Sequence, residues 1–117
     1  MEVYIVVGCF IIFDVITGLI KALYNEGINS TYLRKGLFHK LSEVLAIVGS
    51  GLLEYAIQII DFGLDLPVLN IVASYICLME LVSIIENICE VNPALAKLFH
   101  PYLQKLKNME DNNEERD

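Results

Sequence analysis

Residues 66–85 form an apolar stretch of 20 residues in which Glu80 is the single charge. A helix of that length, at ~1.5 Å per residue, spans the ~30 Å hydrocarbon core of a bilayer. A helix that faces water needs a charged stripe along its whole length, and this stretch has none. We therefore expect a membrane-spanning helix over about residues 67–90, with Pro67 in its first turn.

The second half of this predicted helix carries a polar face. Glu80, Ser83 and Asn87 recur at helical spacing, and Glu86 lies beside them in the sequence. Polar groups at membrane depth turn toward other protein or toward water, because exposure to lipid is costly. We interpret Glu80, Ser83, Glu86 and Asn87 as candidates for contacts between helices.

Two further apolar segments contain one charge each: residues 3–20 contain Asp14, and residues 44–60 contain Glu54. Helices over about residues 3–23, 41–60 and 67–90 would make one all-α membrane domain within residues 1–107. The alternative is a soluble helical bundle. Helices that are apolar all round need burial on every side, and a chain of 117 residues cannot bury three of them.

The first predicted helix also has a polar face. Asp14, Thr17, Gly18 and Lys21 lie at i, i+3, i+4 and i+7. An ionised carboxylate near the membrane centre costs roughly 2.5–3.5 kcal/mol, so Asp14 is expected to face protein, to pair or to carry a proton. A simple hydrogen bond within the bundle is the alternative. Glu54 lies on the corresponding polar face of the second helix.

Two amphipathic segments flank this core. Leucine and phenylalanine recur at helical spacing in residues 25–40, which predicts a short helix on the membrane surface; an ordinary solvated loop is the alternative. A second amphipathic helix is predicted over about residues 93–107, with a kink or break at Pro101. It could dock on a membrane or on another helix. Residues 108–117 are polar and acidic, and we expect them to be disordered.

The basic residues predict an orientation. The connection between the second and third segments has none, so all eight fall on one side of the membrane. By the positive-inside rule, the N-terminus is expected outside and the C-terminus in the cytoplasm. The residues expected at this membrane surface are Lys21, Arg34, Lys35, Lys40, Lys97, Lys105 and Lys107.

Signals for catalysis, cofactors and metals are missing. The sequence has no phosphate-binding loop, no nucleophile motif and no cluster of cysteine and histidine, so we expect neither an enzyme nor a metal site. Its three cysteines have no metal-binding spacing and are interpreted as small apolar residues. The net charge of −7 argues against nucleic-acid binding. A cleavable signal peptide begins with a basic region, whereas this chain has the acidic Glu2 there. We therefore expect the first apolar segment to be retained in the mature protein.

Three regions, in the same order, resemble one family, the three-segment phage-lysis and toxin-secretion holins of Gram-positive bacteria and their phages. The first resembles the family pattern DxxTGxxKA, and the third resembles ExxSIxEN. The second region, which lies between these two, is similar to a family pattern of serine, glycine and lysine residues. The matching residues in these regions are Asp14, Thr17, Gly18, Lys21 and Ala22; Asn29, Ser30, Arg34, Lys35, Gly36, Leu37 and Lys40; and Tyr75, Glu80, Ser83, Glu86 and Asn87.

The resemblance implies a function. Holins form homo-oligomers in the cytoplasmic membrane and open lesions at a set time, through which an endolysin or a large toxin crosses. The residues that would hold the oligomer or line the lesion are Asp14, Thr17, Gly18, Glu54, Glu80, Ser83, Glu86 and Asn87. A small ion or proton channel, or a transporter subunit, is the second interpretation, because membrane carboxyl groups then bind protons. A non-conducting assembly partner is the third.

Overall fold

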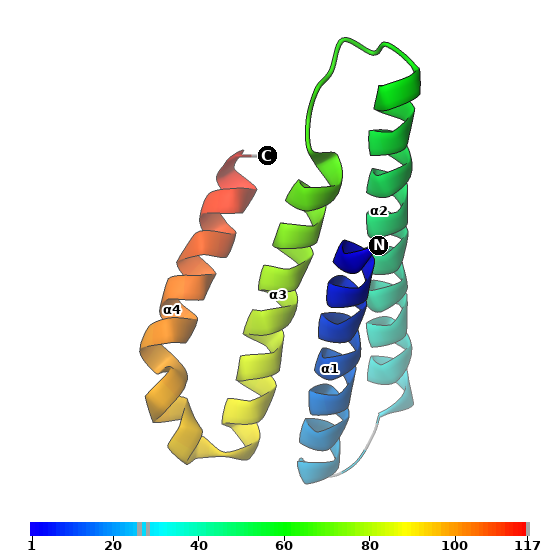
Figure 1. The fold of residues 1–117 in the computed structure, drawn as a ribbon. Coiled ribbons are helices and arrows are strands. Elements are labelled where there is room, and N and C mark those ends of the chain that lie inside the picture. Colours follow the sequence, from blue (N-terminus) through cyan, green and yellow to red (C-terminus); the bar gives the residue numbers. More distant parts are fainter. Residues whose placement is uncertain (26, 28, 117) are drawn as a thin grey trace.

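The chain forms four helices. A computed structural model describes residues 1–25, 27 and 29–116, with residues 113–116 described as backbone only. Each helix runs antiparallel to the next, and the three turns lie at alternating ends of the molecule (Figure 1). The regular structure of the described residues is entirely helical, as predicted. The helices are α1 (Glu2–Tyr24), α2 (Ser30–Ile59), α3 (Val68–Val91) and α4 (Pro93–Arg116).

The central helix is α3, which packs against each of the other three, whereas α1 and α2 touch little. The apolar core between α1, α2 and α3 is small and consists of Val7, Ile11, Ile47, Ala73 and Ile76. Val7 and Ile11 lie one turn apart on α1, Ala73 and Ile76 lie one turn apart on α3, and α2 contributes Ile47 between them.

Helix α2 differs from the prediction of a short surface helix followed by a separate membrane helix. It is one uninterrupted helix of 30 residues, from Ser30 to Ile59. The side chain of Asn29 caps its start, accepting a hydrogen bond of 2.9 Å from the N–H of Thr31. No proline interrupts the segment, and its leucine, lysine and arginine residues favour helix. At ~1.5 Å per residue α2 is ~45 Å long, which exceeds the hydrocarbon core and reaches the interface.

Helix α4 is longer than predicted. Its backbone is helical as far as Arg116, although residues 108–116 belong to the segment that was expected to be disordered. It continues through Pro101 without a break. It changes direction in its first half and then runs back along α3 (Figure 1). An ion pair of 3.0 Å between Lys107 and Glu86 links α4 to α3. Helix α4 also packs along α3, and tertiary packing supplies most of the stability of helices in proteins.

The outer surface of the bundle is apolar. Helices α1, α2 and α3 are each long and apolar enough to cross a membrane, and less than a third of each apolar window is buried inside the protein. Large side chains such as Ile12, Leu45, Leu52 and Ile71 are exposed. An apolar surface of this extent faces lipid or other protein rather than water. The three predicted membrane-spanning helices are therefore confirmed in number and in order.

Candidate functional site

A group of polar side chains lies inside the bundle, where α1, α2 and α3 meet. We call it the polar cluster and define it by six buried or nearly buried residues. Two come from each helix, so the cluster joins all three membrane-length helices. The six are Asp14 and Thr17 of α1, Lys40 and Glu43 of α2, and Glu80 and Asn87 of α3.

On α1, the Asp14 carboxylate is 6% exposed and lies against α3. The amide Nδ2 of Asn87 donates hydrogen bonds of 3.1 Å to Oδ1 of Asp14 and to the hydroxyl of Thr17. The Thr17 hydroxyl in turn donates to the backbone carbonyl of Asp14 at 3.0 Å. Ser83 also interacts with the Asp14 carboxylate. The polar faces predicted for the first and third helices therefore meet each other within one subunit.

Lys40 completes the cluster from α2. Its Nζ hydrogen-bonds directly to Oδ2 of Asp14, and at 2.5 Å to Oε2 of Glu80. Its side chain is only 16% exposed. The prediction that Lys40 lies at the membrane surface is therefore wrong. The long apolar stem crosses between the helices and carries the ammonium to two buried carboxylates, which repay part of its desolvation.

Glu43 is the least satisfied member of the cluster. It is 4% exposed, and neither carboxylate oxygen has a hydrogen-bond partner among the described residues. Oε1 lies 2.9 Å from Nε2 of His39 and 3.9 Å from Nζ of Lys40, but neither contact has hydrogen-bond geometry. Glu80, 2% exposed, shares the ammonium of Lys40 with Glu43.

The cluster has an excess of acidic groups. Its three carboxyl groups surround one ammonium, so the ionised cluster would carry two net negative charges in a low-dielectric interior. Burying charges costs several kcal/mol per ion unless each is paired and hydrogen-bonded. The packed arrangement therefore depends on Lys40, and separating α2 from α1 and α3 would leave buried carboxylates without a counterion.

The other predicted polar residues lie outside the cluster. Glu54 is half-buried, four turns further along α2 than Lys40. Glu86 is 48% exposed and pairs with Lys107. Gly18 faces α3, but a Cβ there would lie 3.7 Å from Asn87, an ordinary contact, so close approach of α1 and α3 does not require glycine.

The basic residues divide into paired and unpaired groups. Lys21 pairs with Glu90 at 3.2 Å, and Asn25 donates a hydrogen bond of 2.8 Å to the same carboxylate. In the described part of the chain, Arg34, Lys35, Lys97 and Lys105 are exposed and no ion pair involves them.

The place of Glu43 and Ser50 on a polar face of the second membrane helix follows from their spacing, but the inward role of Lys40 was not predicted, although a signal for it exists. Lys40, Glu43, Ile47 and Ser50 follow one another at i, i+3, i+7 and i+10, which is one face of a continuous helix. Glu43, Ile47 and Ser50 are the buried residues of α2. Dividing residues 30–59 into two helices separated Lys40 from this face.

Groups of histidine, cysteine and acidic residues suited to a metal ion are absent from the described residues. Cys9, Cys77 and Cys89 are free thiols. The arrangement joins helices through charge and hydrogen bonds.

A four-helix chain with three apolar, membrane-length helices and a buried polar cluster is a small multi-pass membrane protein. The model of the bacteriophage holin family matches residues 1–108, which is nearly the whole chain. The chain therefore belongs to the bacteriophage holin family, which is not a family of enzymes. No curated protein and no solved structure matches it.

Proposed function

We propose that the chain is a holin that associates with further copies of itself in the cytoplasmic membrane of a bacterial host and opens lesions there. The observation that carries this proposal is the family match over residues 1–108. The apolar exterior of α1, α2 and α3 supports it, because such a surface keeps the protein in the bilayer. An endolysin or a large secreted toxin would cross through the lesion, without a need to bind the holin.

The proposed orientation has the N-terminus outside and the end of α3 in the cytoplasm. The proposed cytoplasmic C-terminus requires α4 to leave its position along α3 in the membrane, because α4 runs back toward the end of the bundle that holds the N-terminus (Figure 1). The end of α1, the start of α2 and the end of α3 lie at the same end of the bundle (Figure 1). Lys21, Arg34 and Lys35 belong to these segments, whereas the connection between α2 and α3 contains Asp61 and Asp65 and no basic residue. By the positive-inside rule this basic end faces the cytoplasm.

We further propose that the polar residues control opening. In the single subunit, Asp14, Glu80 and Asn87 bond to neighbouring helices, so their polarity is hidden from lipid. In an assembly the same residues, with Thr17, Gly18 and Ser83, would hold subunits together or line the lesion. Glu54 and Glu86 would add contacts at the two ends. Polar contacts between membrane helices contribute about 0.6–2 kcal/mol each.

The test is the size of what escapes. Cells that produce the chain should release a large cytoplasmic enzyme, and a co-produced endolysin should then lyse them. Cells that produce the endolysin alone are the control. Escape of small ions without release of protein would contradict a holin and favour a small channel, for which the buried carboxyl groups of the polar cluster are the supporting observation.

A further inference from the structure

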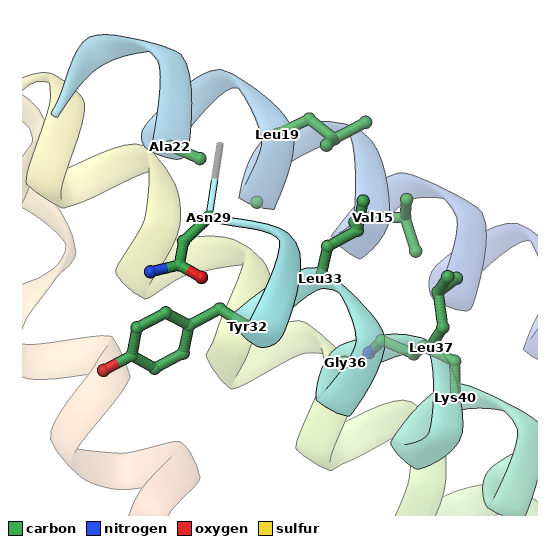
Figure 2. Close-up of a pocket in the computed structure, with 10 residues that line it drawn as sticks. Val15, Leu19, Ala22, Asn29, Tyr32, Leu33, Gly36, Leu37 and Lys40 are labelled. Atoms are coloured by element: carbon green, nitrogen blue, oxygen red, sulfur yellow. The ribbon is translucent and has the colours of Figure 1, made fainter. Parts of the chain in front are cut away.

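An open apolar groove separates α1 from the first half of α2. It has a volume of about 210 Å³, and Val15, Leu19, Leu33 and Leu37 contribute apolar side chains to it. Figure 2 shows Leu33 and Leu37 rising from α2 toward α1, with Asn29 and Tyr32 at one end. The groove lies on the outside of the polar cluster, because Lys40 lines its other end.

Small residues create the groove. Gly18 and Ala22 line it from α1, and Gly36 lines it from α2. A Cβ at Gly36 would meet no atom within 4 Å, so no side chain of this subunit fills the space beside it. Inside a protein such a void would be costly, but here it opens on a surface that faces lipid.

A basic side chain lies beside the groove. A second hollow on α2 shares Leu37 with the groove and is lined by Arg34, Phe38 and Leu41. Arg34 is exposed, and within the described residues it forms no ion pair. Tyr32, 75% exposed at the groove's end, is a residue type that favours the level of the lipid headgroups.

We propose that this groove binds one anionic phospholipid, with an acyl chain between α1 and α2 and the phosphate at Arg34. A guanidinium matches a phosphate because it donates parallel hydrogen bonds to two of its oxygens. The exposed Arg34 and Tyr32 beside the groove favour a lipid headgroup over a helix of a second copy as the occupant. The proposal does not depend on lesion formation.

The experiment measures lipid retained by the full-length protein. The protein is purified in detergent and titrated with phosphatidylglycerol or with phosphatidylcholine, and bound lipid is counted by native mass spectrometry. The expected result is one retained phosphatidylglycerol per chain, preferred over phosphatidylcholine. Replacing Arg34 by glutamine should lower that preference about fivefold. One basic residue near an anionic membrane surface strengthens binding by a factor of about that size. Lys97→Gln, which removes an exposed charge elsewhere, is the control.

A second variant tests the groove itself. Gly36→Leu should fill it and abolish retention of the lipid. Gly49→Leu adds the same side chain to the same helix at a position that is also open, and it should retain lipid as the original chain does. Circular dichroism checks that both variants are helical. Equal lipid retention by the two variants would overturn the proposal. It would also be overturned if the original chain forms dimers that retain no lipid and if Gly36→Leu, but not Gly49→Leu, dissociates them.

Discussion

The ammonium of Lys40 on α2 bonds directly to the carboxylate of Asp14 on α1, although 26 positions separate the two in the sequence. The same ammonium bonds to Glu80 of α3. One side chain therefore joins three helices inside the bundle. Because the described cluster has no second cation, the packing of α2 against α1 and α3 depends on Lys40 more than on any of the carboxylates alone.

Replacing Lys40 by methionine should destabilise the subunit by about 3–5 kcal/mol. Methionine keeps the apolar stem but leaves Asp14, Glu43 and Glu80 buried without a counterion, and breaking a buried pair in this way has a cost of that size. The measurement is unfolding by denaturant in detergent micelles, followed by circular dichroism. Lys35→Met, which removes an exposed charge from the same helix, is the control and should change stability by less than about 0.5 kcal/mol.

Lys40 and Asp14 should be energetically coupled. In the double variant Asp14→Asn with Lys40→Met, one of the stranded carboxylates is gone. The loss of stability should therefore be smaller than the sum of the two single losses by about 1–3 kcal/mol. A second double variant, Lys40→Met with Glu54→Gln, provides the comparison, because Glu54 lies four turns away and its effect should simply add. Additive losses in both double variants would contradict the contact.

The ion pair between Glu86 and Lys107 should contribute little. Both side chains are about half exposed, and pairs of this kind typically contribute about 0.2–1 kcal/mol, which salt weakens. Lys107→Gln should therefore lower the unfolding free energy by less than about 1 kcal/mol at low salt and by less still at high salt. A loss comparable to that of Lys40→Met would show that α4 is fixed to α3 far more strongly than its exposure indicates.

Two glycines of α2 should respond in opposite ways to alanine. At Gly51 a Cβ would lie 1.9 Å from Oη and 3.1 Å from Cζ of Tyr4, so the tyrosine ring must move. At Gly49 a Cβ would meet nothing within 4 Å. Gly49→Ala should stabilise the helix by up to ~1 kcal/mol, whereas overpacking of about 1–3 kcal/mol should cancel or reverse that gain in Gly51→Ala. Thermal unfolding of the two variants side by side distinguishes them.

The arrangement of membrane helices could be predicted from the sequence because hydropathy and helix length leave few alternatives. A single charge in each of three long apolar segments identifies the helices, and the spacing of Asp14 with Thr17, and of Glu80 with Asn87, identifies their polar faces. The intersubunit roles of these residues remain predictions, because the contacts described are within one subunit.

Lys40 and α4 show where sequence reasoning fails. A lysine at the edge of an apolar segment has the same pattern whether its ammonium reaches outward to the headgroups or inward to Asp14, and only the packing of three helices decides between them. The apolar stripe of α4 likewise suits a membrane surface or a helix equally well. Its contact with α3 depends on the direction that the chain takes after Val91.

If the polar cluster controls the opening of a holin lesion, changing its buried carboxyl groups should change the time of opening. The most direct test is the time at which a large cytoplasmic enzyme leaves cells that produce the original chain or the Glu80→Leu or Asp14→Leu variant, at equal levels of protein in the membrane. We expect abrupt release after a delay for the original chain and a shifted onset for both variants. Release on the same schedule in all three would contradict it.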